Sequence, residues 1–352
     1  MAFPVLVLLV VFGCIAVRQV GSVRLYIWQV MLSGAAAVLL TGHISPGDAV
    51  RAIDADIMIF LVGMFVLGRA LEVSGWLAHA GYNLFCRASN ASSLLLFIVA
   101  GAGLLSALLM NDTVAIIGTL IMLLIAMKSR MQYPFSTFAG YLLFPTLVNL
   151  LITLLWLQWR YHEQFGQDVL VHEQGALLDR DLGKLSEMGL LAVVALIAVK
   201  ALFSMIGTDT GFPLTWIALA GMLPVLALSP RRLEIVKGID WQTLVFFASM
   251  FVLMQSVWQS GFFQEILIRS GTDITTLPAV MTIGIILSQL VSNVPLVALY
   301  LPLLAGSGIK TYAALAAAST IAGNVLITGA ASRPKTEANT FPLSNLRLQV
   351  FH

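Results

Sequence analysis

Apolar runs close to membrane-spanning length alternate with short polar segments along most of the chain. The hydrocarbon core of a bilayer is about 30 Å thick, so a spanning helix needs about 20 mostly apolar residues. Stretch 76–86 is too short to span and is expected at the interface or under the bundle, and a short amphipathic piece is expected near 262–268. The other apolar runs predict helices at 3–17, 25–42, 57–71, 94–109, 114–127, 135–157, 188–206, 212–228, 244–257, 277–291, 296–304 and 312–331.

The composition indicates the same class of protein. The chain is 59% hydrophobic and only 10% charged, whereas a soluble domain has about 25% charged residues. Cys14 and Cys86 give no disulfide framework, and nothing fixes the two His-Glu pairs at 162–163 and 172–173 on a common helix face, so neither a metal nor a cofactor is expected. No nucleotide-binding loop and no paired nucleophile and base occur, so we expect neither an ATP-driven pump nor an enzyme, and no nucleic-acid partner.

Two short polar breaks interrupt apolar runs, at 110–113 (Met-Asn-Asp-Thr) and at 292–295 (Ser-Asn-Val-Pro). In hydrocarbon, a backbone that leaves the helix must be buried in protein or must line a cavity. Paired breaks at membrane depth therefore indicate the binding site of a secondary transporter. A channel is a competing interpretation, but inverted repeats with broken helices fit alternating access better.

An internal repeat relates the two halves of the chain. Residues 50–75 align with 236–261 without a gap, and Met-Phe-Val-Leu occurs at both 64–67 and 250–253. At a similar offset, Asn111 meets Asn293, so both polar breaks occupy the same place in the repeat. The matched Asp54 and Asp240 are expected to cap the helices that follow them.

The basic residues predict that these repeats are inverted. Arg231, Arg232 and Lys237 place the loop before 244 in the cytoplasm, while the matching loop before 57 is predicted outside. A consistent bias needs one more span near residue 131, and Arg69, Arg180 and Lys184 then also lie inside. The predicted fold is an all-α polytopic membrane protein of two inverted repeats with re-entrant hairpins and broken helices. Its parts are a first repeat at 1–158, a polar connector at 159–187, a second repeat at 188–332 and a polar tail at 333–352.

Three motifs carry a resemblance to a known family: Leu-Met-Asn-Asp-Thr-Val-Ala at 109–115, Ser-Asn-Val-Pro at 292–295, and Ala-Gly-Asn at 322–324 continuing to Gly-Ala-Ala-Ser at 329–332. The chain resembles the ion-transporter superfamily over most of residues 1–332. It is similar to the branch of arsenite/antimonite exporters, citrate-transporter-like anion carriers and sodium/proton antiporters. In that family, two hairpin tips and two broken helices surround the substrate and the cation.

The resemblance implies the site residues. Asp112 has two compatible interpretations: an intramembrane acid on an ion path, and an N-cap for the arm that begins at Val114. Asn111 and Asn293 can donate amide hydrogen bonds to an oxyanion, or they can cap helices. Substrate binding is assigned to Asn111, Asp112, Thr113, Ser292, Asn293, Asn324, Thr328 and Gly329, and ion coupling to Asp112, Gly323 and Ala330.

The expected function is secondary active transport of a small anion or oxyanion, such as arsenite, a dicarboxylate or a citrate-like molecule, coupled to sodium or protons. The expected place is the plasma or inner cell membrane, as a multi-pass protein in contact with lipid and compatible with a homodimer. The alternatives are a sodium/proton antiporter and a non-transporting truncated remnant. The last arises because the family's first broken helix is absent after Met131, and because a polar tail starts at Arg333 where the second should continue.

Overall fold

The computed structural model describes residues 3–17, 19–20, 23–88, 91–109, 134–160, 177–206, 214–262, 265, 274–291, 296–297, 300–304 and 306–325. Within these ranges the protein is helical, apart from a hairpin of two-residue strands, β1 (Gln19–Val20) and β2 (Val23–Arg24). The first helices are α1 (Phe3–Val17), α2 (Ile27–Leu40), α3 (Pro46–Ala52), α4 (Ala55–Val73), α5 (Trp76–Phe85), α6 (Ala91–Leu109) and α8 (Pro134–Arg160). The later ones are α9 (Arg180–Met205), α10 (Leu214–Leu228), α11 (Arg232–Lys237), α12 (Trp241–Gln259), α14 (Leu277–Val291), the 3₁₀ turn η2 (Leu301–Leu304) and α16 (Ile309–Val325).

The prediction of an all-α membrane protein is confirmed. Three helical stretches in the described ranges are long and apolar enough to cross a bilayer: Leu143–Arg160, Arg180–Lys200 and Trp241–Gln259. Helices α4 and α5 would add a fourth if they count as one span that bends by 71°. Most helix bounds agree with the apolar runs to within a few residues, because those runs are what the bilayer and the core bury.

Three polar segments that were predicted as loops contain helix. Ser45 starts α3 by accepting a hydrogen bond from the Asp48 amide, with Pro46 at the first helical position. The basic loop before α12 contains α11. Residues 180–187, which were predicted in the connector, form the first two turns of α9, where Leu182 and Ser186 are buried and the charged residues are exposed. The run at 296–304 was predicted as a helix, but its last four residues form the 3₁₀ turn η2. Residues 298–299 of this run lie outside the described part.

The internal repeat is visible in how α4 and α12 begin. Asp54 accepts a hydrogen bond from the Ile57 amide at 3.0 Å, and Asp240 accepts one from the Thr243 amide at 3.2 Å. Both carboxylates therefore satisfy one of the amides left free at a helix start, as the sequence predicted. The short helices α3 and α11 precede them at matching positions.

The two helices also end alike. The Ser74 hydroxyl donates to the Leu71 carbonyl, and the Ser260 hydroxyl donates to the Val257 carbonyl. The next residue in each case is a glycine in the left-handed region, with φ of 75° at Gly75 and 70° at Gly261. Residues with a Cβ rarely adopt this conformation, so the glycine fixes the place where each long helix stops.

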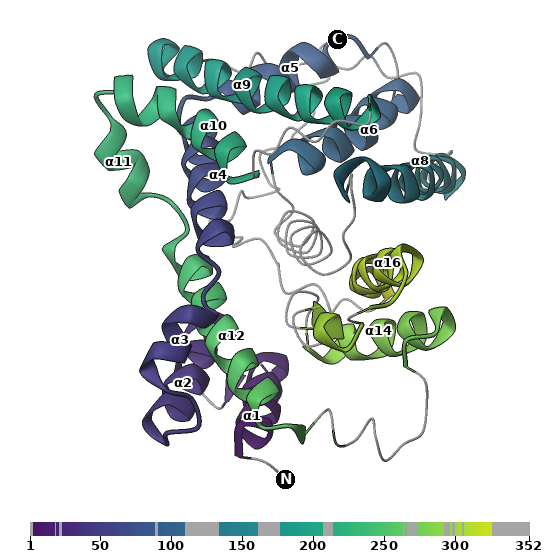
Figure 1. Ribbon diagram of the computed structural model, residues 1–352. Coiled ribbons are helices and arrows are strands. Elements are labelled where there is room, and N and C mark those ends of the chain that lie inside the picture. The colour runs from purple at the N-terminus through teal and green to yellow at the C-terminus, as the bar shows by residue number, and fades with distance from the viewer. Residues whose placement is uncertain are drawn as a thin grey trace.

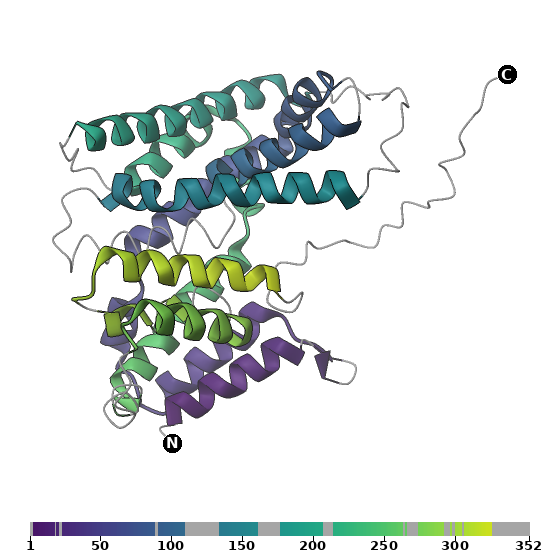
Figure 2. The same ribbon diagram turned by 90° about the vertical axis from the view of Figure 1, so that its right-hand side faces the viewer.

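Each central helix packs against the other half of the chain. Helix α4 contacts α9 and α10, while α12 contacts α1 and α2, which are the elements at corresponding positions of the repeat. In Figures 1 and 2, α4 and α12 run in opposite directions through the molecule. The halves are therefore interlocked, and neither half can bury its central helix alone.

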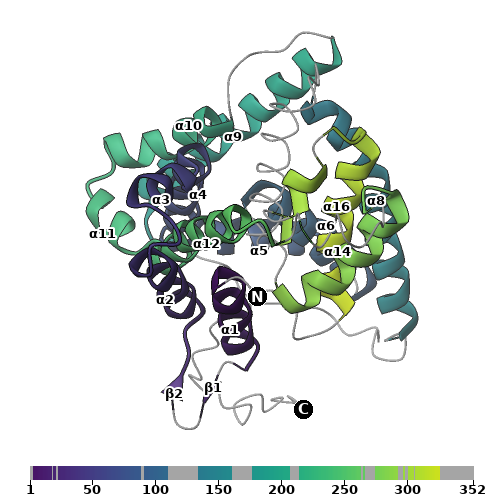
Figure 3. The ribbon, with the colours of Figure 1, turned by 60° about the horizontal axis from the view of Figure 1, so that its bottom comes forward.

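Small residues allow these helices to approach closely. A Cβ on Gly63 of α4 would lie 2.9 Å from the Ala218 carbonyl oxygen of α10, and one on Gly189 of α9 would overlap the Gly221 carbonyl. Close approach matters here because lipid gives no hydrophobic force between helices, so dispersion contacts must hold them together. Helices α6, α8, α14 and α16 form a second group on one side of the molecule, and α8, α16 and α14 lie in succession in the side view (Figures 2 and 3).

We expect Gly63→Ala to lower the midpoint of thermal unfolding of the purified protein in detergent by several degrees. The added methyl group would press on the Ala218 backbone, and overpacking of this kind costs about 1–3 kcal/mol. The matched control is Gly68→Ala in the same helix, where a Cβ would meet nothing within 4 Å. Alanine is the better helix former, so the control should hold or raise the midpoint. Equal midpoints for the two variants would contradict the close packing.

Candidate functional site

The C-terminal halves of α14 and α16 meet in a tight contact. The buried Ser288 hydroxyl, in the last turn of α14, donates a hydrogen bond of 3.1 Å to the Ser319 carbonyl of α16. One turn earlier, a Cβ on Gly284 would lie 2.8 Å from the Ala318 Cβ. An interhelical hydrogen bond and a glycine at the crossing are the features that hold helices together in a membrane.

This contact lies beside the positions that the sequence predicts for the second half of the site. Helix α14 ends at Val291, directly before Ser292 in the chain. Gly323 and Asn324 belong to the last turn of α16, and Asn324 is five residues beyond Ser319, about 7.5 Å along the helix axis. The structure thus brings the end of α14 close to the part of α16 that contains Asn324.

The other predicted site residues fall outside the described ranges. They are Asn111, Asp112, Thr113, Ser292, Asn293, Thr328, Gly329 and Ala330. The approach of Asn111 to Asn293 therefore stays a prediction.

The helices that end beside the two polar breaks, α6 and α14, are linked through contacts with α8 and α16. Helix α6 ends at Leu109, two residues before Asn111 in the chain. It packs on α8, where a Cβ on Gly103 would lie 3.3 Å from Leu150, and α8 in turn contacts α16. The two helices that end at the breaks, α6 and α14, therefore belong to the same group of four.

A family model described as citrate transporter matches residues 6–322. The chain belongs to the citrate transporter family. An uncharacterized transporter of Mycobacterium bovis is 26% identical over 349 residues, covering 81% of this chain and 77% of the relative, and one of Mycobacterium tuberculosis strain H37Rv matches equally. An uncharacterized transporter of a Synechocystis strain is 32% identical over 128 residues, which is 33% of this chain and 28% of the relative.

Membership in the citrate transporter family confirms the resemblance to the ion-transporter superfamily and makes this chain a multi-pass membrane transporter. A transporter of this family takes a small-molecule substrate and works embedded in the bilayer.

An ion-pair cluster ties three elements of the transporter together at one end. Arg231, just before α11, donates to both carboxylate oxygens of Glu234, at 2.8 and 2.7 Å, and to Asp179, before α9, at 3.0 Å. Arg69, near the end of α4, bonds Glu72 at 2.7 Å and adds a favourable charge interaction with Glu234. The end of α4 and the starts of α9 and α11 therefore lie close together. That they share the cytoplasmic side of the membrane stays a prediction.

Local bonds shift the protonation of this cluster. The amide of Leu182 and then the guanidinium of Arg231 lower the pKa of Asp179 below its usual value. The hydrogen bonds from Arg231 lower the pKa of Glu234 in the same way. Sequence reasoning missed the cluster, since Asp179 and Arg231 are far apart in the chain. An Asp directly before an amphipathic run was the one available signal, because it is typical of a helix N-cap.

We expect Asp179→Asn to lower the thermal midpoint at pH 7, because the variant loses the ion pair to Arg231. The pKa of Asp179 is depressed on folding, so its stabilisation is present above the unfolded value near 3.8 and disappears as the pH falls through the folded value. The difference in thermal midpoint between wild type and variant should therefore stay constant from pH 7 to 5. It should shrink toward zero below about pH 4. Asp181→Asn, two residues away and exposed, is the control. A gap that is unchanged at pH 3 would exclude the ionised pair as its cause.

Proposed function

We propose that the protein is a secondary active transporter of a small anion or oxyanion, coupled to sodium or protons, in the plasma or inner cell membrane. The observation that carries the proposal is the contact of α14 with α16, in a chain of the citrate transporter family. This contact draws together the helix that precedes Ser292 and the turn that contains Asn324. Arsenite, a dicarboxylate and a citrate-like molecule are the candidate substrates.

The residue types at the proposed site suit an oxyanion. The amides of Asn111, Asn293 and Asn324 can each donate two hydrogen bonds to carboxylate or oxo groups, and the hydroxyls of Thr113 and Ser292 can add further donors. Hydrogen bonds from several neutral donors bind an anion without creating a fixed charge that would hold it too tightly for release. Thr328, Gly329, Gly323 and Ala330 would complete the substrate and cation shells through the second broken helix.

Asp112 is the proposed coupling residue. A carboxylate at membrane depth is costly, so it persists where it carries out a function such as binding a cation or a proton. Binding of sodium or a proton would neutralise Asp112 and lower the repulsion that an incoming anion meets. In the antiporter alternative, the same carboxylate would alternate between sodium and protons, and no organic anion would move.

We expect Asp112→Asn to abolish gradient-driven flux in proteoliposomes while the protein stays folded and inserted, because the amide cannot exchange a cation or a proton. The assay would follow radiolabelled citrate, succinate and arsenite under a sodium gradient and then under a proton gradient. Asp181→Asn is the control for the loss of one carboxylate. Unchanged ion dependence in Asp112→Asn would reject the coupling role.

The same assay separates the alternative functions. Sodium/proton exchange without flux of any of the three anions would favour the antiporter. A folded wild-type protein that moves neither anions nor cations would favour the non-transporting remnant.

We further expect Asn111→Cys and Asn293→Cys to crosslink with a short bifunctional reagent, because matched positions in an inverted repeat meet near the bilayer midplane. The experiment uses a variant in which Cys14 and Cys86 are replaced by serine. The control pair combines Asn111→Cys with Lys310→Cys, at the start of α16 and about 20 Å along that helix from Asn324. Crosslinking of the control pair alone would contradict the proposed arrangement.

A further inference from the structure

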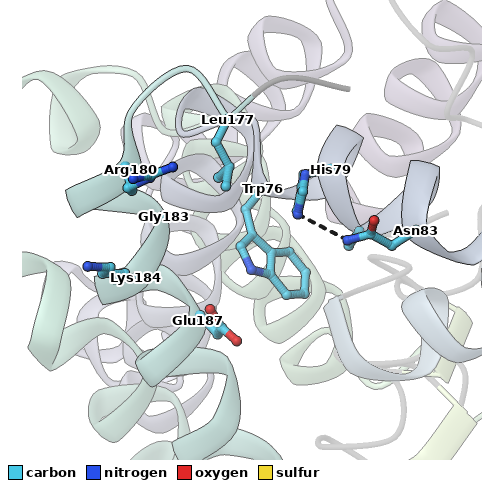
Figure 4. A pocket seen from close by; sticks show the side chains of 9 residues that line it. Trp76, His79, Asn83, Leu177, Arg180, Gly183, Lys184 and Glu187 are labelled. Carbon is cyan, nitrogen blue, oxygen red and sulfur yellow. Dashed lines mark hydrogen bonds between the residues drawn. The ribbon is translucent and has the colours of Figure 1, made fainter. Parts of the chain in front are cut away.

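A cavity of about 440 Å³ lies between α5 and the beginning of α9, and none of the residues that line it is assigned to the transport site. Trp76, His79 and Asn83 line it from α5, and Arg180, Lys184 and Glu187 line it from α9. Figure 4 shows the Trp76 indole between the other two α5 side chains and the basic side chains of α9, with the ring of His79 turned toward Asn83. His79 Nε2 and the Asn83 amide nitrogen are 3.0 Å apart.

The two walls of the cavity are fixed to each other. The amides of Leu178 and Asp179 donate to the Ser74 carbonyl in the turn between α4 and α5, at 3.0 and 3.3 Å. Gly183 makes this junction close, since a Cβ there would lie 3.0 Å from Leu177 and 3.9 Å from Ser74. The start of α9 therefore cannot move away from α5 without breaking backbone hydrogen bonds, and the cavity is preformed.

The charge on the α9 wall is mostly positive. Arg180 and Lys184 are exposed, and among the described residues no carboxylate lies within ion-pair distance of either. The neighbouring Asp179 does not neutralise them, because its carboxylate is held by Arg231 and by the Leu182 amide. Among the described residues that line the cavity, Glu187 is the one carboxylate, and it lies about one helical turn beyond Lys184.

We propose that this cavity binds a phosphate ester group. Arg180 can bind two phosphate oxygens with its planar fork, and Lys184 can add a point charge. The Asn83 amide on the opposite wall has a second hydrogen that it does not donate to His79 and can add a donor, and the volume is that of a small-molecule pocket.

The phosphate can come from two sources, the headgroup of an anionic phospholipid or a soluble phosphate compound. The placement of the cavity favours the lipid. Helix α5 bends 71° away from α4, and the cavity adjoins the ion-pair cluster at one end of the protein. A tryptophan beside basic residues at the end of spanning helices is the arrangement that anionic headgroups recognise.

The test measures binding rather than transport, so its outcome is independent of the proposed function. The full-length protein, purified in detergent, is melted with added phosphatidylglycerol, with phosphatidylcholine, or with inorganic phosphate. We expect phosphatidylglycerol to raise the thermal midpoint and phosphatidylcholine to leave it unchanged. The double variant Arg180→Gln/Lys184→Gln should need at least about tenfold more phosphatidylglycerol for the same rise, because both charge-assisted interactions with the phosphate are lost.

Two further variants keep the proposal falsifiable. Arg232→Gln/Lys237→Gln on α11 removes the same charge away from the cavity and should respond like wild type. Glu187→Gln removes the one acid of the wall and should shift the response to lower lipid concentration. A rise with inorganic phosphate that equals the lipid effect, and that the double variant loses, would assign the site to soluble phosphates. Equal rises in wild type and the Arg180→Gln/Lys184→Gln variant, or no rise with any phosphate probe, would overturn the proposal.

Discussion

The exchange of α4 and α12 between the two halves is the constraint on which the rest of the structure depends. Each helix is largely buried, and each finds its partners among elements of the other repeat. In lipid, exposed apolar surface is not penalised, so a helix stays in the middle of a membrane protein only if its packing is better than its contact with lipid. The glycines at 63, 189 and 221 provide that packing by letting backbones touch.

The same packing logic positions the proposed transport site. Helices α6, α8, α14 and α16 form a second group, whose links to the interlocked helices include contacts of α8 with α9 and of α1 with α14. Within this group, Ser288 and Gly284 hold α14 against α16 at the end where both helices approach predicted site residues. The proposed transport site is thus held by contacts between apolar helices. The ion-pair cluster around Arg231 lies elsewhere, at the end of α4 and the starts of α9 and α11, so the cluster can have a role separate from transport.

Much of this fold could be predicted from the sequence, because the bilayer imposes a simple length rule on apolar runs. The repeat could also be found in the sequence. Asp54 and Asp240 cap the helix starts, and the Ser-Gly pairs end the helices, through bonds to residues only a few positions away. Helices α3 and α11 were missed because they are short and polar. The start of α9 was missed because most of its residues are charged and exposed, and only a few positions in it are buried. No local sequence pattern predicts the ion pair of Asp179 with Arg231 or the cavity beside Trp76, because each is formed by segments that are distant in the chain.

The interlocked repeats have a consequence for how the protein is made. Helix α4 emerges from the ribosome long before α9 and α10, which are its partners and which end at Leu228. At about 5–20 residues per second, the delay is on the order of ten seconds or more. During this interval α4 must wait in the bilayer or beside the insertion machinery with the backbone of Gly63 uncovered. Biogenesis of this transporter should therefore depend on factors that shelter a helix without a partner, and on codon choices that set the pace between the two halves.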